Sequence, residues 1–157
     1  MNYWLMKSEP DEFSIDDLGR VPRKTTSWFG VRNYQSRNFM RDGMKLGDRA
    51  FFYHSSCPEP GIAGIVQVVK AAHPDLSQFD PKSPYFDAKS KPEAPRWLNV
   101  DVKLVEKTRL VSLAELREQP SLKDMVTLQR GNRLSITPVT PRQWSTIVKL
   151  AGKASPA

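Results

Sequence analysis

The segment 97–110 alternates apolar and polar residues, and this pattern constrains the fold of the chain most strongly. The apolar positions are Leu98, Val100, Val102 and Leu104, and the polar positions between them are Asn99, Asp101 and Lys103. Successive side chains of a β-strand point to opposite faces, so the segment predicts a strand with one buried face. The chain is therefore expected to build at least part of its core on a sheet.

Three further segments are predicted to be strands. Residues 3–6 form a short apolar run, residues 49–54 resemble a buried strand, and residues 62–71 are rich in β-branched side chains. The turn between the last two, at 58–61, contains two prolines and a glycine. Residues 73–95 contain five prolines, and a loop of this length in a compact domain is usually functional or mobile.

Helix-start signals occur at four places, between or after the predicted strands. They are Ser14 with Asp17, Asn33 alone, Ser112 with Glu115, and Thr140 with Gln143. The last helix is expected to run to about Leu150 and to end at Gly152. Because strands and helices do not alternate regularly, a doubly wound sheet is not favoured. The pattern predicts an α+β fold, with helices packed outside a small sheet that is curved or closed.

Size and charge narrow the class of protein further. The chain has 157 residues, 39% of them apolar, which suits one domain over 1–152 and a disordered tail over 153–157. The net charge of +7 and the pI of about 9.7 favour a polyanionic partner, although such charge can also serve solubility alone.

The cysteine count and the lack of long apolar runs bear on location. Cys57 is the only cysteine, which excludes a disulfide bridge within the chain and favours a reducing compartment. No apolar run is long enough for a signal peptide or a membrane span. We expect a soluble, intracellular monomer with no membrane partner, cytoplasmic or, in a eukaryote, nuclear.

Sequence motifs for metals and for nucleotide phosphates are missing. A zinc site needs three or four ligands at close spacing, and the chain offers only His54, His73 and Cys57, without a Cys-x-x-Cys pair. Neither the Gly-x-Gly-x-x-Gly nor the Gly-x-x-x-x-Gly-Lys-Ser/Thr pattern occurs. We therefore expect no metal and no cofactor.

Two segments invite a catalytic interpretation, but neither requires one. His54 precedes Ser55, yet neighbours on a strand point to opposite faces, so the histidine is poorly placed to activate that hydroxyl. The run 7–10, Lys-Ser-Glu-Pro, can supply acid–base groups or simply an ion pair at a turn. No catalytic residue is predicted.

Four polar segments that follow apolar strands or turns have an unusual composition. They are Lys7–Pro10, Trp28–Asn33, Tyr53–Ser56 and Arg133–Ser135. Their mixture of Trp, Tyr, Asn, Ser and His suits a flat heteroaromatic ligand, because rings can stack on it and amides and hydroxyls can bind its edge. The arginines that can contact phosphates are Arg32, Arg37, Arg130 and Arg133.

Each of these residues also has a purely structural interpretation. Trp28 can belong to the core, and Asn33 can serve only as a helix cap. Trp97 follows Pro95-Arg96 and can be a core residue at the start of a strand. Trp144 is expected to pack against Val139 at the start of the last helix.

Several longer motifs resemble the EVE domain family. They are Trp4–Pro10, Trp28–Gln35, Phe52–Ser55, Tyr85–Asp87, Pro95–Trp97 and Arg133–Val139. The resemblance extends over residues 2 to 150 and includes the four polar segments. It implies a PUA-like fold, related to YTH domains, with a curved β-barrel of about five to six strands and peripheral short helices.

The resemblance also implies which residues form the pocket. Its pocket positions are Lys7, Ser8, Trp28, Asn33, His54, Ser55 and Ser135. The predicted ligand-binding set also includes Val31, Tyr53, Trp97 and Leu134. Phe86 stands where a Tyr is common in the family, which removes a hydroxyl at that position.

The predicted function is a non-catalytic reader of a modified base in DNA or RNA. The base would be flipped into the aromatic and polar pocket, and a basic rim would contact phosphates. Two alternatives stay open. One is an enzyme acting on a modified nucleobase or nucleotide, suggested by Lys7, Glu9 and His54. The other is a small-metabolite pocket in which the positive charge is incidental.

Overall fold

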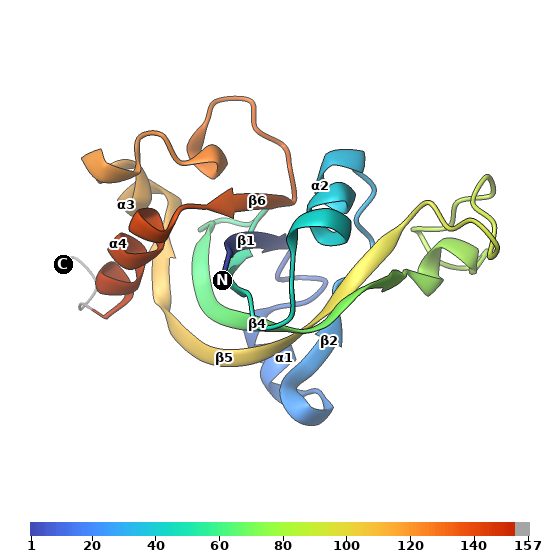
Figure 1. The fold of residues 1–157 in the computed structure, drawn as a ribbon. Helices are drawn as coiled ribbons and strands as arrows, with labels where there is room; N and C mark the ends of the chain where they lie inside the picture. The colour runs from blue at the N-terminus through green and yellow to red at the C-terminus, as the bar shows by residue number, and fades with distance from the viewer. Residues whose placement is uncertain (153–157) are drawn as a thin grey trace.

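The computed structural model describes residues 1–152, which form a six-stranded mixed sheet with short helices around it (Figure 1). The strands are β1 (Tyr3–Ser8), β2 (Thr25–Ser27), β3 (Arg49–His54), β4 (Gly61–Pro74), β5 (Leu98–Ser112) and β6 (Ile136–Val139). Their order is β2-β5-β4-β3-β1-β6, and only the β1–β3 pair is parallel. No pairing among these residues joins β2 to β6, so the sheet is open. The predicted α+β, PUA-like fold class is confirmed, but the sheet does not close into the β-barrel that the resemblance implied.

The two longest strands give the sheet its curvature. β4 and β5 have 14 and 15 residues, and their pairing shifts register at four places. Such irregularities increase local twist, and Figure 1 shows both strands bending beneath β1. The four predicted strand segments are all present. β2 and β6 were not predicted, because each is too short to show alternation in the sequence.

Both faces of the central strands are buried. Met6 and Phe52 belong to one core cluster, whereas Leu5 and Phe51 belong to the other. This division follows from the alternation of side chains along β1 and β3. The second cluster contains Trp144, which stacks on Phe51 with a centroid distance of 4.0 Å and has the packing role that the sequence predicted.

The α-helices are short and lie outside the sheet. They are α1 (Ile15–Arg20), α2 (Tyr34–Asn38), α3 (Leu113–Arg117) and α4 (Pro141–Ala151). Single helical turns occur at Pro22–Lys24, Leu76–Phe79, Pro120–Leu122 and Val126–Leu128, and a π turn, Phe39–Gly43, continues α2. The predicted final helix is confirmed, and the predicted tail over 153–157 lies outside the described residues.

The predicted helix starts are confirmed, with one difference in detail. Ser14 and Thr140 each form a complete capping box. At α3 the Ser112 hydroxyl accepts from the Glu115 N–H as expected, but the Glu115 carboxylate pairs with Arg109 at 2.7 Å instead of turning back to the cap. An arginine offers that carboxylate two charged donors, which outweigh a single backbone N–H.

Candidate nucleic-acid interface

A cleft of about 890 Å³ opens where the four polar segments meet. Nine of the predicted site residues line it: Lys7, Ser8, Trp28, Val31, Arg32, Asn33, Ser55, Arg133 and Ser135. Further lining comes from Glu9, Glu12, Phe13, Thr26, Ser27, Phe29, Gly30, Ser56, Ser83, Pro84 and Tyr85. The volume lies within the range of ligand-binding pockets in proteins, roughly 300–1,000 Å³.

The topology of the sheet explains why these segments come together. β1 and β3 run parallel, so their carboxyl ends lie side by side, and the Ser55 N–H donates to the Ser8 carbonyl at 2.9 Å. The Lys7 N–H donates to the Ser135 carbonyl at 2.8 Å, which holds the third segment beside them. The fourth segment follows β2, where the Trp28 N–H donates to the Val100 carbonyl at 2.8 Å.

Trp28 belongs both to the core and to the cleft. Its side chain is only 7% exposed and meets Phe52 edge to face, with centroids 5.3 Å apart. It therefore forms the floor of the cleft, and both interpretations of this residue hold. The more accessible aromatic residue is Phe29, which is 56% exposed and packs against the Tyr85 ring.

Phe29 and Tyr85 are site residues that the sequence reasoning did not select. Both lie inside motifs that carry the family resemblance, so the signal was present without a specific role. The Tyr85 hydroxyl donates to the Glu12 carboxylate at 3.1 Å, which ties the loop containing Tyr85 to the segment after β1. Phe86, where a hydroxyl is missing, does not line the cleft.

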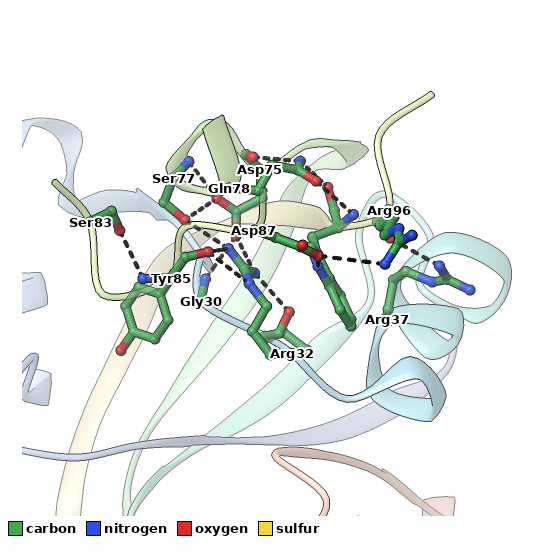
Figure 2. Close-up of polar contacts among 12 residues, drawn as sticks. Gly30, Arg32, Arg37, Asp75, Ser77, Gln78, Ser83, Tyr85, Asp87 and Arg96 are labelled. Atoms are coloured by element: carbon green, nitrogen blue, oxygen red, sulfur yellow. Dashed lines mark hydrogen bonds and ion pairs between the residues drawn. The ribbon is translucent and has the colours of Figure 1, made fainter. Parts of the chain in front are cut away.

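Arg32 is held inside the chain by a network of hydrogen bonds (Figure 2). Its guanidinium donates to the Tyr85 carbonyl, the Asp75 carboxylate, the Ser77 hydroxyl and the Val31 carbonyl. A guanidinium has five N–H donors, and these contacts use all five. The structure thus gives Arg32 a structural role, and the predicted phosphate contact would require these bonds to break.

Asp75 is the anionic centre of this network. Burial raises the pKa of its carboxyl, but hydrogen bonds from Ser77, Gly30 and Arg32 outweigh burial and lower that pKa overall. The side chain has no exposed area, and its ion pair with Arg32 is 3.1 Å long. The carboxylate therefore stays ionised and fixes the wall of the cleft to the segment after β4.

Asn33 has the two roles considered from the sequence. Its Oδ1 accepts from the Ser36 N–H at 3.0 Å and caps α2, while the residue is exposed and lines the cleft. Within residues 1–152 the Nδ2 group has no acceptor, so it is available to a ligand. Arg133 is exposed at the same rim and has no side-chain polar partner in this part of the chain.

Trp97 and Arg37 lie outside the cleft. The Trp97 indole N–H donates to Asp87 at 2.8 Å, and its ring stacks on Tyr34 with centroids 4.8 Å apart. Arg37 donates to the Arg96 carbonyl at 2.9 Å, as Figure 2 shows. The structural interpretation of Trp97 is the one that the geometry supports.

His54 also does not line the cleft, although the resemblance placed it there. Its Nε2 accepts a hydrogen bond from the Ile15 N–H at 3.1 Å, and burial lowers the pKa of the imidazole. The atom that a general base would use is thus already occupied. This contact argues against His54 as the base of an enzyme built on Lys7, Glu9 and His54.

Of the remaining predicted residues, two line a neighbouring cavity and one lines neither. Tyr53 and Arg130 line a second cavity, and Lys7 lines both. Leu134 lines neither, and its N–H donates to Asn132 at 2.9 Å.

Over residues 1–152 there is no cluster of three or more metal-ligating side chains. No helix in that part of the chain is long and apolar enough to cross a membrane.

The EVE domain model matches residues 2–150 of the chain. The chain belongs to the EVE domain family. Thymocyte nuclear protein 1 of Homo sapiens is 46% identical over 170 residues, which cover 97% of this chain and 75% of that protein. The family assignment made from the motifs is thereby confirmed.

Solved structures agree with the EVE fold. A Pseudomonas putida protein has a TM-score of 0.90 and 51% identity, covering 95% of this chain and 99% of its own. The human THYN1 protein, crystallised in complex with DNA containing 5-methylcytosine, has a TM-score of 0.93 and 45% identity, covering 99% and 100% respectively.

Proposed function

We propose that this EVE domain is a non-catalytic module that binds nucleic acid and accepts a modified base in its cleft. The observation that carries the proposal is the match, along 99% of the chain, to a human protein crystallised with DNA containing 5-methylcytosine. That match favours DNA over RNA as the partner, with 5-methylcytosine as the first base to test. The intracellular location and the monomeric state stay predictions.

The cleft has the chemistry that a flipped base needs. Extruding a base from a duplex costs a few kcal/mol, which stacking and edge hydrogen bonds must offset. Trp28 supplies the floor, and Phe29 supplies an exposed aromatic face at the rim. The hydroxyls of Ser55 and Ser135 and the amide of Asn33 can donate to or accept from a base edge.

A methyl group on the base adds only a small increment to binding. Burying one methyl carbon is worth about 0.8 kcal/mol, which corresponds to about a fourfold preference. The phosphates therefore supply much of the affinity, and the net charge of +7 suits that role. Arg133, exposed at the rim, replaces Arg32 as the arginine best placed to contact a phosphate near the cleft.

The test is a fluorescence-anisotropy titration with two duplexes that differ only in one 5-methylcytosine. We expect the methylated duplex to bind more tightly by about fourfold. The double variant Ser55→Ala, Ser135→Ala should weaken binding to both duplexes, whereas Ser145→Ala, an exposed serine on α4, should not. Equal affinity of the wild-type protein for both duplexes, and for duplexes with other modified bases, would contradict the proposal.

A further inference from the structure

A second cavity of about 570 Å³ lies beside the base cleft. The end of β1 contributes Lys7, β3 contributes Tyr53, α3 contributes Arg117, and the loop 127–132 contributes Arg130 and its neighbours. Neither the mechanism of base binding nor the family motifs assign a role to Arg117. The cavity is therefore a distinct feature that shares only Lys7 with the cleft.

The lining of this cavity is positively charged without compensation. Lys7, Arg117 and Arg130 are cations, and no Asp or Glu lies among the lining residues. Within residues 1–152 none of these three side chains has an ion pair or a hydrogen bond to a carboxylate. Three cations around one concave space repel one another, and an anion between them removes that repulsion.

Lys7 gives the clearest sign that the cavity favours an anion. It follows Leu5 by two residues along β1, so its side chain shares the face of Leu5 and Tyr53. Its ammonium lies 6.0 Å from the centre of the Tyr53 ring. Burial lowers the pKa of Lys7, whereas a nearby carboxylate would raise it. The ammonium is half-buried and has a ring, but no anion, as its neighbour.

The loop that closes the cavity is held in place by its own side chains. The Gln129 amide donates to the carbonyls of Lys123 and Met125, and the Asn132 amide donates to the Val126 carbonyl. Gly131 has a φ of 79°, a conformation that glycine adopts at little cost. Arg130 is thereby presented from a loop of defined shape, and little backbone entropy has to be lost on binding.

We infer that this second cavity is a phosphate-binding site, formed by Lys7, Arg117 and Arg130 with the Tyr53 hydroxyl as an additional donor. A phosphate group matches the charge and the polar lining of the cavity, which has room for it. Because Lys7 lines both cavities, a phosphate bound here lies next to the base cleft. We assign this phosphate to the DNA strand that carries the flipped base. This assignment rests on the proposed function, whereas the phosphate site itself does not.

The first arm of the test uses inorganic phosphate alone, without nucleic acid. Titration into ¹⁵N-labelled protein should shift the Gly131 amide and the Arg side-chain resonances of the cavity. The double variant Arg117→Gln, Arg130→Gln should lose these shifts. The control is Arg142→Gln, which removes an exposed arginine on α4 that lines neither cavity. This arm does not depend on base recognition, so it separates a failure of the site from a failure of the proposed function.

The second arm measures the salt dependence of duplex binding. Each lost phosphate contact reduces the magnitude of the slope of log K against log salt by about 0.9. The slope of the double variant should therefore be smaller in magnitude by roughly one to two. The preference for the methylated duplex should be unchanged, because neither arginine lines the base cleft. An unchanged slope together with phosphate-induced shifts would still support the site, but with a free phosphorylated compound as its ligand. An unchanged slope with no phosphate-induced shifts would overturn the inference.

Discussion

The Nε2 atom of His54 accepts a hydrogen bond from the backbone N–H of Ile15, the first residue of α1, over a distance of 3.1 Å. Only the neutral imidazole can accept this bond, so protonation must break it. Burial lowers the pKa of His54 below its ordinary value of about 6.5, in agreement with that requirement.

The sign of the resulting pH effect follows from linkage. Below pH about 6.5 the unfolded chain binds a proton at His54 before the folded chain does, so protons favour unfolding. The stabilisation is fully present above that pH and is lost as the pH falls through the lower folded-state pKa. We expect urea denaturation at pH 7.5, 6.5 and 5.5 to give a free energy of unfolding that decreases in this order. His54→Gln, which does not titrate, should flatten the decrease. An identical decrease in the wild-type protein and in His54→Gln would contradict this role.

Breaking the Asp75–Arg32 pair by substitution of Asp75 is expected to destabilise the protein strongly. Asp75 is fully buried, and Asp75→Ala removes the carboxylate that neutralises Arg32 and accepts from the Gly30 N–H. Removing one partner of a buried ion pair costs about 3 kcal/mol. Urea unfolding at pH 7 measures this cost. As a control, Asp42→Ala breaks the exposed pair with Arg41 and should leave the unfolding free energy nearly unchanged. Equal effects of the two substitutions would show that Asp75 is not the anchor of this wall.

The sequence predicted more of the cleft than of the contacts that hold it in place. Apolar alternation and capping residues specify strands and helix starts locally, so β3 and α4 could be predicted from their own residues. The roles of Arg32 and His54 could not, because each depends on a partner far along the chain. Asp75 is 43 residues from Arg32, and Ile15 is 39 residues from His54. The family motifs marked these positions without distinguishing a ligand contact from a structural one.

Substitution of Gly30 is expected to disturb the same wall of the cleft. Its φ is 85°, and a Cβ at this position would lie 2.9 Å from the Tyr85 ring. We expect Gly30→Ala to destabilise the protein through both the backbone conformation and this clash, and to displace Tyr85 from the cleft. Gly47→Ala is the matched control, because Gly47 has a φ of 89° but no atom within 4 Å of the added Cβ. The backbone cost of about 1 kcal/mol should be common to both variants. If urea unfolding shows no additional loss for Gly30→Ala, the contact with Tyr85 is unimportant for stability.

Phe29 offers a test of base stacking that is separate from stability. Its side chain is 56% exposed at the rim of the cleft, so Phe29→Ala should lower the urea unfolding midpoint only modestly, through the lost contact with the Tyr85 ring. Stacking of a base on an aromatic ring is worth about 1–3 kcal/mol, so affinity for the methylated duplex should fall at least about fivefold. Phe29→Tyr, which keeps the ring, should restore most of the affinity. Leu76→Ala is the control for loss of an exposed apolar side chain, because Leu76 is 75% exposed and does not line the cleft. If Phe29→Ala and Leu76→Ala bind the duplex as tightly as the wild-type protein, the exposed ring does not contact a base.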